Sequence, residues 1–484
     1  MSAAQEHQKL DYLERIKQHL VEDGHPVEIS VFAQMLYERV PSSELLAEDP
    51  ATRAQAAADF YGFTKERPLG GPKLRVFNPS SKNNGWHNDD TVIEIVNTDG
   101  PFLVDSVVLA LNALGIGAKL IIHPVMFIKR DQAGQLIGIE QESKTGFEAE
   151  SVMHVEIERQ RHHSQLDRIE KAIQAGLDEL QHAVRDWRPM VSQARAIADE
   201  LSATHQDMSA EQIAELSAFI HWLADDHFTF LGYREYVVED QGQDRVLRAL
   251  GETGLGIMHA DRVEAPIRPL KDLARGADQR SRSEPVIITK TNAMSKVHRA
   301  GYMDYISVLY FGPDGRVARE KRLIGLFTSG AYIRRCQDTP LVRRKVELVM
   351  SQSGLRPNSH AAKALLHILE TLPREELFQA TSAELLSLGI GILDLQERSQ
   401  TRVFLRRERF GRFFSCLVYI PRDRFNTENR LKIQAILKRA LKGQTIDFAI
   451  QVGESNLARV HVVVRPREYA PNEFDVEKIE DKIK

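Results

Sequence analysis

The residues best suited to binding a small ligand lie in the segment 97–102, Asn-Thr-Asp-Gly-Pro-Phe. A short β-rich run precedes this segment and a helical pattern follows it, so it should form the turn at a helix N-terminus. Free backbone N–H groups at such a terminus suit a carboxylate, and Asp99 can hold an ammonium group. The candidate effector-binding residues for an amino acid are Asn97, Thr98, Asp99, Gly100 and Phe102. The alternative is that these residues only form the turn and cap the helix.

Other residues with chemical potential lack the spacing of a catalytic motif. The sequence contains no H-E-x-x-H, Walker A loop, dinucleotide fingerprint or nucleophile elbow. His360 and His367 share a predicted helix face, but no acidic or cysteine partner completes a metal site. Gly251, Gly254 and Gly256 have the wrong spacing for a nucleotide loop. We therefore expect no catalytic, cofactor-binding or metal-binding residue in this chain.

Residues 401–443 are strongly basic, with 12 Lys plus Arg against 3 Asp plus Glu, in a chain of net charge −4. The phenylalanines interleaved with these cations are Phe404, Phe410, Phe413 and Phe414. A basic sheet with aromatic rings is typical of proteins that stack nucleic-acid bases. Non-catalytic nucleic-acid binding through this face is therefore an alternative function. The interpretation that we favour is a basic face docked on an acidic neighbouring domain.

The composition is that of a globular protein, with 484 residues of which 42% are hydrophobic and 27% charged. Such a length predicts about three domains. Two cysteines, Cys336 and Cys416, are too few for a disulfide framework. The longest uncharged apolar stretch, 106–118, is shorter than the roughly 20 residues that span a bilayer. The amino end does not resemble a signal peptide, so we expect a cytoplasmic protein that does not enter a membrane.

The elements that would position segment 97–102 follow from hydrophobic periodicity. Residues 1–62 have a helical pattern, and residues 63–90, rich in proline and glycine, are predicted as mostly loop. The strands predicted next are 91–96, 119–128, 135–140 and 151–158, and the helices are 104–114 and one that starts at 164 and breaks at Pro189. This order is that of a ferredoxin-like βαββαβ sandwich, for which 228–238 is the candidate fourth strand.

The rest of the chain is predicted as a mixed region followed by a second sandwich. Within residues 240–400 the predicted strands are 285–290, 302–311 and 319–327, and the helices are 341–353, 359–371 and one from 382. Residues 401–465 have the order ββαββ, which a βαββαβ sandwich gives when it begins at its second strand. Residues 474–483 begin an amphipathic helix. A pattern cut at that point indicates a fragment of a longer protein or a frayed native terminus.

Several sequence strings resemble a known family. Residues 91–126, TVIEIVNTDGPFLVDSVVLALNALGIGAKLIIHPVM, resemble an ACT domain, with Phe102 where such domains commonly have glycine. The strings that resemble the amino-terminal half of the large bacterial NAD-specific glutamate dehydrogenases are HWLADDHFTFLGYREY (221–236), RLIGLFTSGAY (322–332), ILETLPREELFQ (368–379) and FGRFFSCLVYIPRDRFNTE (410–428). This second resemblance covers about residues 90–465.

The resemblance implies a parent enzyme that oxidises L-glutamate to 2-oxoglutarate and ammonia with NAD. Its catalytic and NAD-binding residues should lie beyond residue 484, so no cofactor is expected in this segment. The implied partners are a small amino-acid effector, the C-terminal catalytic region of the same polypeptide, and further copies of the chain in a homo-oligomer. A structural scaffold whose ACT-like folds have lost their ligands is the other alternative.

The sequence as a whole predicts an α+β fold built from repeated ACT-like, ferredoxin-like modules, with an N-terminal helical segment and a mixed α/β middle domain. The predicted domains are an N-terminal helical segment (1–70), a first ACT-like domain with added helices (88–205), a mixed α+β middle domain (206–400) and a second, truncated ACT-like domain (401–484).

Overall fold

The computed structural model describes residues 3–204, 208–242, 244–259, 268–269, 285–395, 398–453, 455–467 and 474–484. They form two compact units, one of residues 1–184 with 295–301 and the other of residues 185–294 with 302–484. The elements of the first unit are α1 (Ala3–Glu22), α2 (Val27–Tyr37), α3 (Ser42–Leu45), α4 (Pro50–Thr64), β1 (Lys73–Phe77), α5 (Ser81–Asn84), β2 (Thr91–Thr98), α6 (Leu103–Ala113), β3 (Ala118–Ile122), β4 (Val125–Arg130), β5 (Leu136–Glu140), β6 (Glu148–Ile157) and α7 (His163–Arg185). The four predicted domain ranges stay predictions.

The amino-terminal helices α1 to α4 confirm the helical prediction for residues 1–62. The Asp49 carboxylate caps α4 by accepting a hydrogen bond of 3.1 Å from the backbone N–H of Ala51. Pro50 takes the first helical position, where a missing N–H costs nothing. The apolar faces of α1, α2 and α4 share one buried cluster with residues of β2, β3, β4 and β6. These helices therefore cover one face of the sheet.

The sheet of the first unit has the order β1-β2-β6-β4-β5, with β3 also paired to β6, and all of its pairs are antiparallel. The prediction of residues 63–90 as mostly loop was wrong for β1, whose five residues pair with β2. The predicted strand 119–128 is divided into β3 and β4 at His123 and Pro124. Proline cannot donate a ladder hydrogen bond, which explains the division.

The predicted fourth strand, 228–238, does not join this sheet. It forms part of a strand in the second unit, and the sheet edge beside β2 is occupied by β1 instead. The helix predicted from residue 164 also ends earlier than expected. It stops at Arg185, and Pro189 lies in the first turn of the next helix, where a proline is tolerated.

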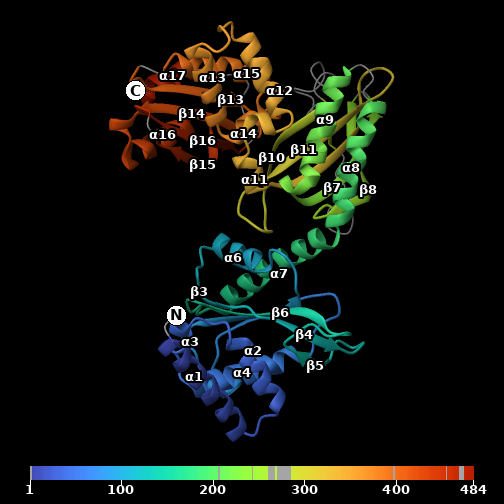
Figure 1. The fold of residues 1–484 in the computed structure, drawn as a ribbon, viewed down its shortest axis with the longest axis vertical. Helices are drawn as coiled ribbons and strands as arrows, with labels where there is room; N and C mark the ends of the chain where they lie inside the picture. The colour runs from blue at the N-terminus through green and yellow to red at the C-terminus, as the bar shows by residue number, and fades with distance from the viewer. Residues whose placement is uncertain are drawn as a thin grey trace. The chain divides into compact units, whose positions relative to one another are not determined.

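Helices cover both faces of the first unit's sheet. Figure 1 shows α6 and α7 on one face and α1, α2 and α4 on the other. The sequence predicted residues 151–158 as a half-buried strand, but β6 is buried continuously from Glu150 to Ile157. The polar side chains of β6 are buried because the amino-terminal helices cover the face that the alternating pattern assigned to solvent.

The second unit contains a six-stranded sheet with the order β10-β11-β12-β7-β8-β9. Its elements are α8 (Trp187–Thr204), α9 (Ala210–Trp222), β7 (Phe228–Gln241), β8 (Asp244–Gly256), β9 (Arg268–Pro269), β10 (Val286–Met294), β11 (Tyr302–Phe311), β12 (Val317–Phe327), α11 (Ser329–Ile333), α12 (Val342–Gln352), α13 (His360–Thr371), α14 (Arg374–Gln379) and α15 (Ser382–Leu393). The predicted strands near 285–290, 302–311 and 319–327 are confirmed, as are the predicted helices. Strand β8 was not predicted.

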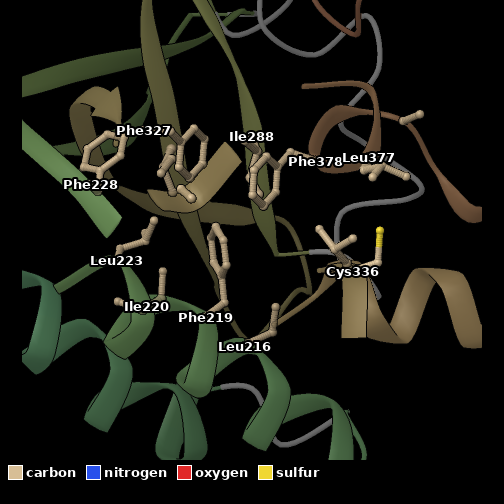
Figure 2. Packing of buried hydrophobic residues seen from close by; sticks show 14 of the residues in the cluster. Leu216, Phe219, Ile220, Leu223, Phe228, Ile288, Phe327, Cys336, Leu377 and Phe378 are labelled. Carbon is tan, nitrogen blue, oxygen red and sulfur yellow. The ribbon is translucent and has the colours of Figure 1, made fainter. Parts of the chain in front are cut away.

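One apolar cluster joins this sheet to the helices around it (Figure 2). Leu216, Phe219 and Leu223 of α9 and its C-terminal turn face Phe327 of β12 in this cluster. The rings of Phe327 and Phe378 stack with their centroids 4.4 Å apart and nearly parallel. Because Phe378 lies on α14, this stack fixes the short helix α14 against the sheet.

The carboxyl-terminal part of the second unit is a four-stranded antiparallel sheet with the order β13-β14-β16-β15. Its elements are β13 (Arg402–Arg407), β14 (Phe414–Pro421), α16 (Thr427–Ala440), β15 (Gly443–Gln451), β16 (Leu457–Pro466) and α17 (Val476–Ile483). The predicted ββαββ order and the helix after it are confirmed. No helix within the described ranges has both the length and the apolar composition needed to cross a membrane.

Candidate functional site

The five predicted effector-binding residues lie at the end of β2 and in the loop that joins it to α6. Asn97 and Thr98 end β2, and the backbone N–H of Asp99 donates to a carbonyl of β6 at 2.9 Å. The side chains of Thr98 and Asp99 are exposed. The backbone then turns through Phe102, whose φ of 65° is left-handed, and α6 begins at the next residue.

The first turn of α6 is the predicted position of a carboxylate site, and that site stays a prediction. No side chain caps its N-terminus among the residues whose structure is described. The first N–H groups of a helix lack intrahelical acceptors and form the positive end of its dipole. A ligand carboxylate can therefore accept hydrogen bonds at this turn, close to the exposed carboxylate of Asp99.

A segment distant in sequence, 295–301, borders the same helix start and belongs to the same unit. The imidazole of His298 packs on the ring of Phe102, with centroids 4.2 Å apart. Its Nδ1 lies 3.5 Å from Oδ2 of Asp105. The hydroxyl of Ser106 donates to the carbonyl of Phe102 at 2.7 Å and accepts from the backbone N–H of His298 at 3.4 Å. Sequence reasoning missed this contact because nothing local links residues 192 positions apart.

A second group of polar side chains surrounds the other end of the loop. Arg67 donates from Nη1 to the hydroxyl of Thr98 at 3.3 Å. His123 lies with Nε2 2.5 Å from the hydroxyl of Ser151. Burial lowers the pKa of His123, and the nearby charge of Asp99 partly opposes that effect. The neutral imidazole is thus favoured at neutral pH.

The sheet face that packs against α4 contains a buried ionic network. His154 lies between two carboxylates, with Nδ1 3.3 Å from Oε1 of Glu94 and Nε2 3.3 Å from Oε1 of Glu156. Arg53 of α4 donates to Glu156 at 2.9 Å, and Arg75 of β1 donates to Glu94 at 2.7 Å. Burial raises the pKa of Glu156, but His154 and Arg53 outweigh it and lower that pKa to about 2. The network connects α4 and β1 to strands β2 and β6.

Helix α14 forms a joint between three parts of the second unit. Arg374 donates to Sγ of Cys336 at 3.0 Å. Glu375 pairs with Lys290 of β10 at 2.9 Å. Glu376 accepts two hydrogen bonds from Arg406 of β13, of 2.8 and 2.9 Å. Three consecutive charged residues of the string ILETLPREELFQ thus bind three different elements.

The basic segment 401–443 does not form a base-stacking surface with its phenylalanines. Phe410, Phe413 and Phe414 are buried, and Phe404 is half-buried. Arg406, a prominent cation of the segment, is also enclosed, where it pairs with Glu376. Because these rings fill the protein core, the residues that suggested nucleic-acid binding have a structural role, which leaves that alternative without support.

The glycines that cluster near residue 254 do not fit a dinucleotide. Gly251, Gly254 and Gly256 lie in β8, and a Cβ on Gly254 would come within 2.2 Å of the carbonyl oxygen of Met258. Gly256 donates its N–H to Asp186 at 2.8 Å. These glycines therefore serve close backbone packing, and we derive no NAD chemistry from them. Where the structure describes the chain, no group of three His, Cys, Asp or Glu residues is arranged to hold a metal ion.

Three family descriptions match this chain, and together they cover more than half of it. They are "Glutamate dehydrogenase, ACT1 domain" at residues 32–173, "Glutamate dehydrogenase, helical motif 1" at 339–398 and "Glutamate dehydrogenase, ACT2 domain" at 402–484. The chain belongs to this glutamate dehydrogenase family. The predicted resemblance and the two ACT-type domains are thereby confirmed.

Relatives named NAD-specific glutamate dehydrogenase match along the chain. The Halomonas elongata protein is 35% identical over 100% of this chain and 30% of its own length. The Pseudomonas aeruginosa protein is 34% identical over 97% of this chain and 29% of its own. The Mycobacterium tuberculosis protein is 29% identical over 77% of this chain and 22% of its own. The chain therefore corresponds to the amino-terminal part of these proteins and spans less than a third of their length.

Proposed function

We propose that this chain is the regulatory and assembly region of a cytoplasmic NAD-dependent glutamate dehydrogenase. The parent reaction converts L-glutamate, NAD⁺ and water to 2-oxoglutarate, ammonia and NADH. The catalytic region and the NAD site lie outside the chain, as part of the same polypeptide. The match to NAD-specific glutamate dehydrogenases along the whole chain supports this assignment.

Within this region, the loop 97–102 is the proposed site for a small amino-acid effector. The observation that carries the proposal is the uncapped N-terminus of α6 beside the exposed carboxylate of Asp99. These two features complement the carboxylate and the ammonium group of an amino acid. Phe102 and His298, whose rings are in contact at the same turn, form an aromatic border for the ligand's side chain.

The two sheet modules are proposed to be the same ferredoxin-like sandwich in two chain permutations. The orders β1-β2-β6-β4 and β15-β16-β14-β13 match if β1 and β15 take the place of the fourth strand. In the first module the chain begins at that fourth strand, and in the second it begins at the second strand. The pairing order supports a common architecture because all pairs in both sheets are antiparallel.

Titration calorimetry of single amino acids into the chain tests the effector site. We expect one class of amino acid to bind, and Asp99→Ala to weaken it by roughly 10- to 100-fold, because a hydrogen bond to a charged group contributes about 1.5–3 kcal/mol. Asp89→Ala is the matched control, since Asp89 is an exposed carboxylate just before the other end of β2. Thermal unfolding should be unchanged in both variants.

Two outcomes would contradict the proposal in different ways. Equal binding by the wild type and Asp99→Ala would remove the effector from this loop. An absence of binding by every amino acid would leave a structural scaffold as the function of the chain. The parent activity is tested separately, by measuring glutamate-dependent NAD reduction with the longer polypeptide.

A further inference from the structure

Exposed apolar side chains are concentrated in two parts of the chain. Among the described residues, 18 large hydrophobic side chains are exposed, and nine of them lie in residues 1–50 or 427–452. These two stretches contain 76 of the 484 residues. Scattered exposed apolar residues need no explanation, but concentrations of them mark interaction surfaces.

The first concentration, which we call the acidic surface, is formed by helices α1 and α2 and the residue that follows α3. Its apolar members are Leu10, Val21, Val27, Val31 and Leu46, which are 39% to 73% exposed. Leu10 and Val21 are eleven residues apart on α1, three helical turns, and so share one face. Residues 1–50 carry ten Asp plus Glu against four Lys plus Arg, and all ten carboxylates belong to exposed residues.

The second concentration, which we call the basic surface, is formed by α16 and the edge strand β15. Its apolar members are Leu431 on α16 and Phe448, Ile450 and Val452 in and after β15, each 44% to 53% exposed. The last three alternate along the strand and therefore share one face. The guanidinium of Arg430 lies over the ring of Phe448 at 4.4 Å, which joins the helix and the strand into one surface.

The charge of the basic surface is opposite to that of the acidic surface. Residues 427–452 carry five Lys plus Arg against two Asp plus Glu. The cations are Arg430, Lys432, Lys438, Arg439 and Lys442, of which all but Arg430 belong to exposed residues. Two copies of the basic surface facing each other would bring like charges together, which opposes a symmetric contact. Among the described residues, strand β15 pairs only with β16 and so lies at the edge of its sheet.

We propose that the basic surface of one copy binds the acidic surface of a second copy. This inference rests on the self-association proposed above and names the surfaces that carry it. The contact joins two different patches, so each chain offers one acidic and one basic surface to its neighbours. The apolar side chains supply the buried area, and the opposite charges select the partner and the orientation.

Sedimentation velocity of the chain, followed over protein concentration and salt, tests the contact with two charge-reversal variants. Glu6→Lys/Glu14→Lys reverses the charges one turn on either side of Leu10. Lys438→Glu/Arg439→Glu reverses two exposed cations of α16. We expect the wild type to associate, each variant to be monomeric, and association of the wild type to weaken at about 1 M salt, where the Debye length is about 3 Å.

Mixing the two variants distinguishes pairing of the acidic surface with the basic surface from pairing of either surface with itself. The first variant retains the basic surface and the second retains the acidic surface. These two surfaces can pair in the mixture, which should therefore again contain dimers. Phe448→Ser should weaken association in the same way. Val125→Ser is the control, because Val125 is exposed but lies outside both surfaces. Circular dichroism of each variant should match the wild type.

The possible results separate this inference from the proposed function. A wild type that is monomeric at every concentration would reject both the self-association and the surfaces. A wild type that associates, with variants that associate equally well, would reject the surfaces and leave self-association standing. Association lost in the variants but not restored by mixing them would reject the pairing of the acidic surface with the basic surface. Effector binding is measured independently of all three.

Discussion

Helices α6 and α17 correspond to each other in the permuted arrangement that we propose for the two sheet modules, but they begin in different ways. Helix α6 follows the turn Asp-Gly-Pro-Phe and has no side-chain cap within the described residues. Helix α17 begins after Asp475, whose carboxylate accepts a hydrogen bond of 3.0 Å from the backbone N–H of Lys478. In the second module the chain itself thus supplies a carboxylate at the helix N-terminus, the position at which we propose that the first module binds a ligand carboxylate. We infer that amino-acid binding belongs to the first module alone.

The modules also differ in what their buried charges hold together. In the first, Arg53 and His154 connect the sheet to the amino-terminal helix α4 of the same unit. In the second, Arg406 connects β13 to α14, which is in turn attached to β10 through Glu375 and Lys290. The two modules have similar strand orders but are attached to different neighbouring helices. The fold sets the pairing of strands, whereas the ionic residues on each face determine what the module is joined to.

The largest effect should come from Arg406→Ala in the second module. Burial raises the pKa of Glu376, but the charge and hydrogen bonds of Arg406 outweigh it and lower that pKa to about 2. Removing Arg406 leaves this carboxylate buried without its main partner, which costs about 3–5 kcal/mol. The free energy of unfolding in urea should fall by that amount.

Arg402→Ala is the control for this measurement, on the same strand. Arg402 is exposed, and its ion pair with Glu480 spans 3.3 Å, so its loss should cost under about 1 kcal/mol. Replacing both Arg406 and Glu376 by apolar residues should cost less than replacing Arg406 alone, because no unpaired charge is left. Equal losses from Arg402→Ala and Arg406→Ala would show that the α14 joint contributes no special stability.

The local features of the loop region could be predicted from the sequence, and the distant ones could not. The stop of α6 is local: Gly115 has a φ of 74°, and the N–H of Ile116 donates to Leu111 at 3.0 Å. Strand β1 was not predicted because prolines flank it in the sequence. Its pairing with β2 at the sheet edge is a tertiary contact that no local pattern indicates. The packing of His298 on Phe102 is likewise invisible to any local pattern.

Burial of polar residues was the other limit of sequence reasoning. In β6, His154 and Glu156 alternate with apolar residues and therefore indicate a solvent-facing side. The amino-terminal helices cover that side, and ionic partners from α4 and β1 offset the free-energy cost of burying these polar side chains. The string around Arg374, Glu375 and Glu376 identified the family, but its role as a joint depends on partners more than 25 residues away.

A pH-dependent effect should distinguish the first module from the second. Burial lowers the pKa of His154, but hydrogen bonds and charges from Glu156 and Glu94 outweigh it, so the pKa is raised above its usual value. The protonated imidazole therefore contributes stability that is fully present below pH about 6.5, the unfolded value, and is lost as pH rises through the folded pKa.

Hydrogen exchange of peptides from β2 and β6 should therefore show faster opening as the pH rises above neutrality, after correction for the intrinsic exchange rate. In His154→Gln this additional pH dependence should disappear. Peptides from β14 and β16 serve as the internal control, because burial lowers the pKa of His461 in that module despite the charges of Glu376 and Glu375. The same pH response in His154→Gln as in the wild type would assign the effect to another group.

The smallest expected effect tests the difference between the two helix starts directly. Asp475→Ala removes the carboxylate cap of α17, and loss of such a cap costs about 1 kcal/mol, with a range of about 0.5–2 kcal/mol. Exchange of peptides from α17 should quicken accordingly, whereas amino-acid binding measured by calorimetry should not change. Asp99→Ala should show the opposite pattern, with unchanged stability and weaker binding. Asp475→Ala could instead create a second amino-acid site. That result would show that the carboxylate of Asp475 alone prevents the second module from binding an amino acid.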